Sequence, residues 1–339
     1  MVKILVTGGC GFIGSHTIID LLDAGFNIVN IDNLSNSSIE VIDQIKKVSG
    51  KDFDHYSYDL CDIDKLKEVF TNHPDIVGVI HFAALKSVGD SVEQPLQYFQ
   101  NNVSSLINLL ATANEFKAKY FVFSSSCTVY GNADHLPVTE QTPMKEAESP
   151  YGRTKQIGEY MLEDVARGTE IQCIALRYFN PAGAHPTGLI GESPTNPAQN
   201  LVPIITEVAI GKRDIMQVYG DDYNTEDGSC VRDYIHIMDL ASAHTKALMF
   251  LMSDQQDKAY DVFNVGVGKG TSVFAAIHSF EKVTGQKLNY KVGPRRAGDV
   301  VEIYADNTKI SETLGWEAKY GLDDIMSTAW AWEKKRTNG

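Results

Sequence analysis

The sequence predicts an α/β fold built on a doubly wound parallel sheet over residues 1–180. Two observations point to it. Short runs rich in β-branched residues alternate with helical patterns, beginning KILVTG, SHTIIDLLDAG, FNIVNID and SIEVIDQIKKVSG. The same rhythm continues through the apolar runs IVGVIHFAA, YFVFSSS and IQCIALRYF. Such alternation is typical of parallel strands joined by crossover helices that cover both faces of a sheet.

The regular alternation ends after Asn180. The next stretch, PAGAHPTGLIGESPTNPAQN, is a Pro-, Gly- and Asn-rich connection of about 20 residues. That is too long for a simple turn in a compact domain, so we expect it to border a ligand site. The shorter elements that follow, among them LVPIITEVAIGK, IMQVYG and FNVGVG, predict a smaller α/β substrate domain. It spans residues 181–339, and parts of it could rejoin the first sheet.

Composition limits the kinds of partner. The chain has 339 residues, 43% hydrophobic and 22% charged, as is ordinary for a globular protein. Its formal net charge of −14 argues against nucleic acid and anionic membranes, because both require a surplus of Lys and Arg. An anionic ligand would therefore need local counter-charges.

The cysteines and the first residues indicate a compartment. Five cysteines stand far apart without a CxxC pair, so we expect reduced thiols and no metal site. MVKILVTGG reaches glycine too early for a signal peptide, and no apolar run approaches the ~18 residues of a membrane helix. These features predict a cytoplasmic protein.

TGGCGFIG places Gly8, Gly11 and Gly14 between the first strand and the first helix. Glycine is needed where the backbone turns tightly and approaches a pyrophosphate, whose charge the helix N-terminus stabilises. Asp32 ends the second strand 18 residues after Gly14, near the ~20 expected of the acid that binds the adenosine ribose. The pattern predicts a Rossmann site, and a carboxylate without an arginine in DNLSNSS favours NAD over NADP. Alternatively, Asp32 caps a turn; Asp59 contacts adenine or is an ordinary strand-end residue.

SPYGRTK places Tyr151 one helical turn before Lys155, on the same face. An ammonium beside a phenol stabilises the phenolate, and oxidised nicotinamide adds positive charge. We therefore expect the pKa of Tyr151 to fall from ~10 towards neutrality, so that it can act as a base. Ser126 ends the strand YFVFSSS about 25 residues earlier, placed to share a proton with a substrate hydroxyl. Structural explanations remain open, since Ser149 and Pro150 suit a helix start and the serines suit a polar turn.

Along essentially its whole length the sequence resembles the extended short-chain dehydrogenases/reductases, and within them the UDP-hexose 4-epimerases. The motifs that carry the resemblance are TGGCGFIGSH, DNLSNS, HFAALKSVGDSVEQPLQYFQNNV, SSSCTVYG, SPYGRTK, LRYFNPAGAHPTGLIGE, TEDGSCVRDYIHIMDLA and PRRAGDV. The glycine motif indicates only the superfamily. The stretches after residue 180 make the match to the epimerases close.

The resemblance implies an isomerase of galactose metabolism that interconverts UDP-glucose and UDP-galactose. In this family a base takes the proton of the sugar 4-hydroxyl while hydride passes from carbon 4 to NAD. The 4-keto sugar then turns on its diphosphate, and the hydride returns to its other face, so NAD can stay bound. The resemblance makes Tyr151 the base, Lys155 its electrostatic partner and nicotinamide-ribose anchor, and Ser126 the hydroxyl bonded to the sugar oxygen.

Further ligand contacts are implied by the resemblance. For NAD they are Gly8, Gly11, Phe12, Ile13, Gly14, Asp32, Asn33, Leu34, Ser35, Asn36, Ser37, Asp59, Leu60, Phe82, Ala83, Ala84, Leu85, Lys86, Asn101, Ser126, Tyr151, Lys155 and Phe179. For the UDP-sugar they are Lys86, Ser126, Tyr151, Asn180, Asn200, Leu201, Val218, Tyr219, Arg232, Arg296, Asp299 and Ile303. Arg232 and Arg296 make physical sense as counter-charges, because guanidinium binds phosphate bidentately. Without the family, Arg295 and Arg296 could be a solvated surface pair.

Two other functions fit parts of the sequence. Nucleotide-sugar 4,6-dehydratases need an Asp-Glu pair beside the serine, where this chain has Cys127 and Thr128. Elimination is therefore disfavoured, as is decarboxylation of a glucuronate, for which relatives also use an acid here. A cofactor-sensing protein without catalysis would have little reason to retain Ser126, Tyr151 and Lys155 together.

Two positions depart from the family pattern. Cys127 stands where alanine is common; we expect it to pack as a small residue, with a thiol that could react with thiol reagents. Ile303 falls where side-chain bulk controls access for sugars substituted at carbon 2. Its intermediate size predicts UDP-glucose and UDP-galactose as main substrates, with weak N-acetyl activity at most.

The resemblance also bears on assembly. Family members are commonly dimeric through helices such as those expected in SVEQPLQYFQNNVSSLINLLATANEF and SPYGRTKQIGEYMLEDVARG. We therefore expect a homodimer.

Overall fold

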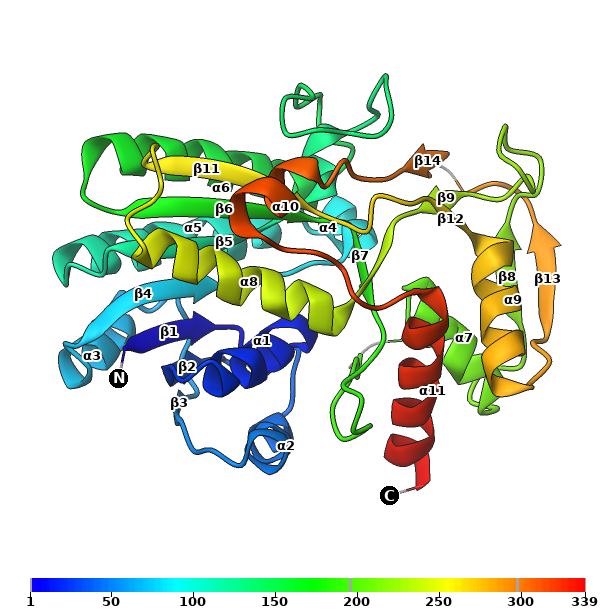
Figure 1. Cartoon of the computed structure of the whole chain (residues 1–339), viewed down its shortest axis with the longest axis horizontal. Helices are drawn as coiled ribbons and strands as arrows, with labels where there is room; N and C mark the ends of the chain where they lie inside the picture. The colour runs from blue at the N-terminus through cyan, green and yellow to red at the C-terminus, as the bar shows by residue number, and fades with distance from the viewer. Residues whose placement is uncertain (1, 195–196, 297–298, 339) are drawn as a thin grey trace.

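A seven-stranded parallel sheet forms the centre of the molecule (Figure 1), in a computed structural model that describes residues 2–194, 197–296 and 299–338. The strand order is β11-β6-β5-β4-β1-β2-β3, and every neighbouring pair is parallel. The order reverses at β1, which confirms the predicted doubly wound α/β fold and places the switch point between β1 and β4. The strands are β1 (Lys3–Thr7), β2 (Asn27–Ile31), β3 (Asp54–Tyr56), β4 (Ile76–His81), β5 (Tyr120–Ser126), β6 (Gln172–Tyr178) and β11 (Tyr260–Val265).

Helices cover both faces of this sheet. Consecutive residues of β1 alternate between them, because Ile4 and Val6 belong to one apolar core and Leu5 to the other. A strand buried on both faces needs apolar residues at nearly every position, which explains why these strands are recognisable as continuous apolar runs. One face carries α1 (Phe12–Asp23), α2 (Glu40–Ser49) and α8 (Ile237–Met252), and the other carries α3 (Ile63–Asn72), α5 (Pro95–Glu115) and α6 (Pro150–Gly168).

The half of the chain after residue 180 contributes to this sheet in two ways. Strand β11 pairs with β6 along its whole length, and α8 packs beside α1. Helix α10 (Thr308–Leu314) packs against β11 and α8. The central sheet of the first part is therefore completed by residues that come late in the chain.

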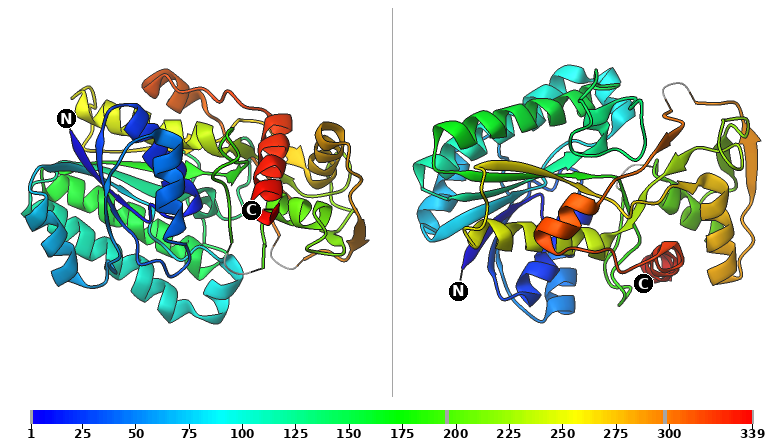
Figure 2. Two further views of the ribbon diagram at one scale, coloured as in Figure 1. Left: turned by 90° about the horizontal axis from the view of Figure 1, so that it is seen from below. Right: turned by 45° about the horizontal axis from the view of Figure 1, so that its top comes forward.

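The other late elements lie beyond the carboxyl ends of the central strands, to the right in Figure 1. Figure 2 shows α7, α9 and α11 side by side at this end. They share a separate apolar core that includes Ile205, Phe280 and Ile325. The elements are β7 (Asn180–Ala182), α7 (Leu201–Ala209), β8 (Met216–Tyr219), β9 (Val231–Arg232), β10 (Tyr234–His236), β12 (Thr271–Ser272), α9 (Val273–Thr284), β13 (Tyr290–Gly293), β14 (Glu302–Ile303) and α11 (Leu322–Asn338).

Loops at the carboxyl ends of the central strands face this second part. They include two short helices, α4 (Val88–Glu93) and η1 (Cys127–Tyr130). Within the described ranges, no helix is long and apolar enough to cross a membrane, and no three or more His, Cys, Asp or Glu side chains are grouped as metal ligands would be. Most of the predicted site residues lie on these loops.

Candidate active site

The glycine turn after β1 is closed against a neighbouring loop. Gly8 has a φ of +72°, and its N–H donates to the carbonyl oxygen of Ile31 at 2.8 Å. A Cβ atom at Gly8 would lie 2.7 Å from the backbone nitrogen of Ala83, so only glycine fits. The N-cap of α1, Gly11, has no side chain to satisfy the first N–H groups of the helix. The helix dipole and these N–H groups favour an anion here.

Asp32 ties this turn to the segment after β2. Its side chain is buried, and one carboxylate oxygen accepts the N–H of Cys10 at 2.9 Å. The other accepts the N–H of Leu34 and the hydroxyl of Ser37, each at 2.9 Å. Asp32 therefore does hold a turn, and this does not exclude a ligand, because each carboxylate oxygen has two lone pairs and the oxygen that accepts from Cys10 uses only one of them.

The predicted adenosine contacts lie beside Asp32. The side-chain amide of Asn33 donates to Asp59 at 3.1 Å, so the segments after β2 and β3 meet. Leu60 is buried in the core beneath them, and Ser35 donates its N–H to Asn33 at 3.1 Å. This part of the site is thus held by its own side chains.

The loop after β4 is fixed by a residue that the sequence analysis missed. Asn102, on α5, accepts the N–H of Leu85 at 2.8 Å and donates to its carbonyl at 3.0 Å. It also donates to Thr154 on α6 at 3.2 Å, and it accepts the side-chain amide of Asn101 at 2.9 Å. The signal was a buried Asn on an apolar helix face, next to the Asn101 that was named. Asn102 thereby joins the loop of the predicted nicotinamide contacts to the helix of Tyr151.

The end of β5 and the start of α6 lie together. Ser149 caps α6 by accepting the N–H of Gly152 at 3.1 Å, and Pro150 is the first residue of the helix. SPYGRTK therefore does begin a helix, as the structural explanation proposed. Lys155 is buried, and its Nζ lies 5.8 Å from the centre of the Tyr151 ring. The Ser126 hydroxyl, which accepts the N–H of Thr128 at 3.3 Å, also forms a hydrogen bond that lowers the pKa of Tyr151. The structure thus brings the three predicted catalytic residues together.

Burial dominates the electrostatics of this site in the protein without NAD. Burial raises the pKa of Tyr151 to about 12, although the hydrogen bond of Ser126 acts in the opposite direction. Burial likewise lowers the pKa of Lys155 to about 7. The lysine ammonium points to Ser124, donating to its carbonyl at 2.6 Å and its hydroxyl at 3.2 Å. Without the nicotinamide, burial therefore outweighs any effect of Lys155 on the phenol. The expected fall of the Tyr151 pKa, which relied on Lys155 and oxidised nicotinamide together, stays a prediction for the protein with bound NAD.

Four predicted UDP-sugar residues form one cluster in the second part. Asp299 accepts from Arg296 at 2.6 Å and lies 3.7 Å from Arg232. The Arg296 guanidinium stands 5.4 Å from the centre of the Tyr219 ring. Arg295 points elsewhere, to Asp222 at 2.7 Å. The side chains of the two neighbouring arginines thus point to different partners, and of the two only Arg296 shares Asp299 with Arg232.

Other residues predicted to contact the UDP-sugar are less exposed to solvent. Val218 is 1% exposed and belongs to the core of the second part, so only its backbone can face a ligand. Leu201 packs against the same core as first residue of α7. Phe179 is buried after β6, and the adjacent Asn180 is half-buried on β7.

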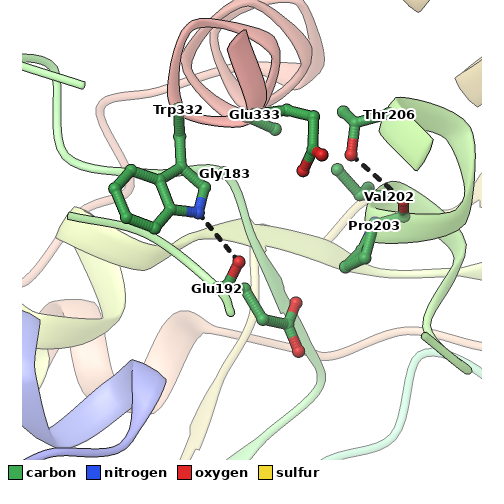
Figure 3. A pocket seen from close by; sticks show the side chains of 8 residues that line it. Gly183, Glu192, Val202, Pro203, Thr206, Trp332 and Glu333 are labelled. Carbon is green, nitrogen blue, oxygen red and sulfur yellow. Dashed lines mark hydrogen bonds between the residues drawn. The ribbon is translucent and has the colours of Figure 1, made fainter. Parts of the chain in front are cut away.

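The connection 181–200 supplies a second residue that the sequence analysis missed. Glu192 accepts the side-chain amide of Asn200 at 3.0 Å and pairs with Lys86 at 3.5 Å. Its carbonyl accepts the indole N–H of Trp332 on α11 at 2.8 Å (Figure 3). Glu192 and Glu333 line the small pocket drawn there. Glu192 thereby links predicted ligand residues of the two parts, which no local pattern in the sequence indicated.

The two departures from the family pattern lie at one apolar cluster. Ile303 is 6% exposed and packs with Phe179, Val138 and their neighbours, with Cys127 at the margin. Burial raises the pKa of the Cys127 thiol to about 12. The suggested reactivity of this thiol is therefore disfavoured, because the thiolate is the nucleophile.

Comparisons with known proteins agree with this geometry. The family profile for GDP-mannose 4,6 dehydratase matches residues 5–329. A UDP-glucose 4-epimerase of Dictyostelium discoideum is 44% identical over 338 residues, which cover 99% of this chain and 97% of the relative. That of Bacillus subtilis is 45% identical over 337 residues, covering 99% and 98%.

Solved structures show the same likeness. A UDP-glucose 4-epimerase of Stenotrophomonas maltophila, with bound NAD and formylated UDP-arabinopyranose, is 42% identical with a TM-score of 0.96, covering 100% of this chain and 99% of that one. The enzyme of Bifidobacterium longum, in complex with NAD+ and UDP, is 41% identical with a TM-score of 0.94, and covers 99% of both chains.

The doubly wound sheet, the glycine turn and the matched profile define an extended short-chain dehydrogenase/reductase of the GDP-mannose 4,6-dehydratase type. Within that class, the chain belongs to the UDP-glucose 4-epimerase family.

Proposed function

We propose that this protein is an isomerase that interconverts UDP-glucose and UDP-galactose by reversible oxidation at sugar carbon 4, in galactose metabolism. The observation that carries the proposal is the meeting of Ser126, Tyr151 and Lys155 at one end of the sheet, next to the glycine turn. The family membership supports it. NAD is the cofactor, which when bound takes a hydride from carbon 4 and returns it.

The protein's residues fit NAD at both ends. Gly8 lets the loop after β4 pack directly against the glycine turn, and the uncapped N–H groups at the start of α1 favour the pyrophosphate. The one lone pair left free on Asp32, on Oδ2, suits a ribose hydroxyl, and the negative charge of the carboxylate repels a 2′-phosphate. Lys155 then holds the nicotinamide ribose.

Each catalytic side chain has a distinct task. Tyr151 takes the proton of the 4-hydroxyl as base, and Ser126 hydrogen-bonds the same sugar oxygen. Because burial raises the pKa of Tyr151 in the protein alone, the phenolate forms only with two positive charges nearby. One is protonated Lys155, and the other is oxidised nicotinamide.

Arg232 and Arg296 bind the diphosphate of the substrate. In the structure they share the carboxylate of Asp299, an anion whose place phosphate oxygens can take. The remaining predicted contacts, including Asn180, Asn200 and Tyr219, surround the uridine and the sugar. Glu192, Lys86 and Asn200 connect this part to the cofactor loop.

The dehydratase alternative is disfavoured at the same site, although the matched profile bears that name. The elimination of water needs an acid and a base beside the serine, and here Cys127 and Thr128 follow it. A thiol with a raised pKa cannot replace a carboxylate at neutral pH.

The decisive experiment incubates purified protein with UDP-galactose without added cofactor. UDP-glucose is followed by chromatography, and reduced nicotinamide by absorbance near 340 nm. Formation of UDP-glucose is expected, because the cofactor is regenerated in each cycle. A 4-keto-6-deoxy product would indicate a dehydratase instead, and no product with NAD supplied would indicate a sensing protein.

A homodimer in the cytoplasm completes the proposal. Exposed apolar side chains on α4, α5 and α6 support the pairing, and the best exposed are Val92 at 61% and Leu96 at 81%. All five cysteines are free, as in a reducing compartment. Light scattering after gel filtration is expected to give twice the mass of the 37.4 kDa chain; a monomer would contradict the pairing.

Ile303→Ala tests the control of sugar size. The truncation opens space in the buried cluster, so kcat/KM for UDP-N-acetylglucosamine is expected to rise relative to that for UDP-glucose. It also costs ~2–5 kcal/mol of stability, as for other buried isoleucines. Val138→Ala, in the same cluster, should lose stability without changing the ratio. Wild-type kcat/KM values that are comparable for both sugars would contradict the role of Ile303.

A further inference from the structure

Glu159 extends the catalytic face of helix α6. It follows Tyr151 by eight residues and Lys155 by four, so the three side chains lie along one side of the helix. Glu159 is 1% exposed, and none of the steps described above uses it. A buried carboxylate this close to a catalytic lysine requires a physical account.

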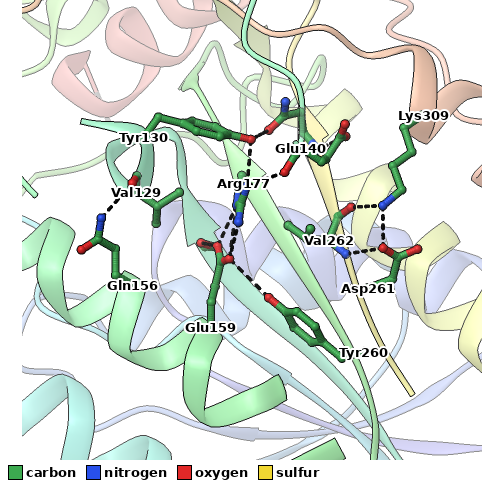
Figure 4. A network of polar contacts seen from close by, with 12 residues as sticks. Val129, Tyr130, Glu140, Gln156, Glu159, Arg177, Tyr260, Asp261, Val262 and Lys309 are labelled. Atoms are coloured by element: carbon green, nitrogen blue, oxygen red, sulfur yellow. Dashed lines mark hydrogen bonds and ion pairs between the residues drawn. The ribbon is translucent and has the colours of Figure 1, made fainter. Parts of the chain in front are cut away.

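The Glu159 carboxylate is held by donors from three strands (Figure 4). Arg177, on β6, donates from Nε to Oε1 at 2.9 Å and from Nη2 to Oε2 at 2.6 Å. Ser125, on β5, donates its hydroxyl to Oε1, and Tyr260, on β11, donates to Oε2 at 3.3 Å. Helix α6 is therefore fastened at this turn to all three strands that lie beneath it.

The arginine continues the network to the other side of the catalytic serine. Its Nη1 donates to the hydroxyl of Tyr130 at 2.9 Å, and Tyr130 donates to Asn264 at 2.6 Å. Tyr130 ends the short helix η1 that Ser126 caps. Ser125 itself lies between Ser124, which binds Lys155, and Ser126. The ion pair thus contacts the segments on both sides of Ser126, one turn of α6 beyond Lys155.

Stability alone does not account for two charges in this place. A buried ion pair pays a desolvation cost that often cancels its attraction, so apolar residues of similar size are frequently as stable. Loss of only one partner costs ~3–5 kcal/mol, because the other charge stays buried. Unlike apolar side chains, the ion pair is directional. Its bidentate hydrogen bonds form in only one register of α6 against the strands.

The carboxylate also acts on the lysine through its charge. Burial lowers the pKa of Lys155, and the negative charge of Glu159 raises it again. The titratable and charged groups around the lysine and this carboxylate are Tyr151, Arg177, Tyr130, Tyr178, Tyr260, His81, Glu140 and Glu163.

We propose that Glu159 is a positioning residue for the reaction: its ion pair with Arg177 fixes the register of α6 against β5 and β6, and so sets the catalytic face of the helix against the serine end of β5. The inference rests on the proposed function, because it assigns a role within that reaction.

Glu159→Gln tests it, with kcat, KM and the pH profile measured on UDP-galactose beside the wild type. We expect kcat to fall ~10–100-fold, with KM within about threefold, because the arginines that bind the diphosphate lie on other elements. The alkaline limb of the kcat profile should move to lower pH, because Lys155 loses a neighbouring negative charge and must stay protonated. Glu159→Asp should recover part of kcat and the wild-type limb.

A second readout does not need activity. Hydrogen–deuterium exchange of the first turn of α6, residues 150–156, should be faster in Glu159→Gln than in the wild type. Glu333→Gln is the matched control, since Glu333 is also buried and pairs with Lys212 and Arg336. It should lower the melting temperature while leaving kcat, the pH profile and exchange in residues 150–156 unchanged.

The outcomes separate the two proposals. A folded Glu159→Gln protein with wild-type kcat, pH limb and exchange would overturn the positioning role, and so would a loss confined to KM.

If Glu159→Gln does not fold, the double variant Glu159→Gln/Arg177→Gln leaves no unpaired charge. It should fold with a low kcat and an alkaline limb at lower pH than the wild type, as in the single variant, whereas wild-type kcat in it would overturn the role. Wild-type protein without epimerase activity would refute the proposed function, and the exchange data would still decide whether Glu159 orders the helix.

Discussion

Tyr151→Phe is expected to lower kcat on UDP-galactose by ~10²-fold or more, since the change removes the proton acceptor and keeps the ring. KM should change little, because the arginines that bind the diphosphate lie on other elements. Steady-state kinetics with chromatographic detection of UDP-glucose measures both. The size of the effect is that expected when a general base is removed.

A loss of structure must be separated from a loss of chemistry. The variant should retain bound NAD and its melting temperature, and Tyr160→Phe, an exposed tyrosine on the same helix, should leave kcat unchanged. If Tyr151→Phe kept more than about a tenth of the activity, the assignment of the base would be wrong.

Gly8→Ala should abolish retention of the cofactor. The new methyl group would lie 2.7 Å from the backbone of Ala83, and the left-handed backbone adds a cost of ~1–2 kcal/mol. The NAD content of the purified protein, measured after denaturation, should fall from near one per chain to a small fraction. Activity without added NAD should disappear with it.

Gly25→Ala is the matched control. Gly25 has a φ of +91°, and a Cβ there meets nothing within 4 Å. The control therefore carries the same backbone cost without the clash, and it should lose stability but keep its NAD. If both variants lost NAD equally, the loss from Gly8→Ala would be explained by lower overall stability, and not by the clash at the glycine turn.

Local patterns in the sequence predicted the central sheet well. Strands such as KILVT and YFVFSSS are buried on both faces, so each contains consecutive apolar residues, and the helices between them have ordinary amphipathic spacing. The catalytic residues were also visible, because Tyr151 and Lys155 lie four residues apart and the serine ends a strand. These signals all arise within a few residues of one another.

What the sequence could not predict depends on contacts between distant segments. Asn102, Glu159 and Glu192 resemble any other polar residue until the fold brings their partners to them. Spacing also could not show that burial raises the pKa of Tyr151 in the protein without NAD, because desolvation depends on how α6 is packed. Burial is a property of the whole structure, whereas spacing is a property of one helix.

The position of β11 has a consequence for synthesis of the protein. Strand β6 remains an open edge, and the outer side of α1 remains without α8, until residue 265 has left the ribosome. Ile18 and Leu21 of α1 share their core with Leu248 and Phe263. The cofactor turn, although encoded within the first 14 residues, therefore becomes fully supported only late in translation, and during that interval the nascent chain is a natural client for chaperones.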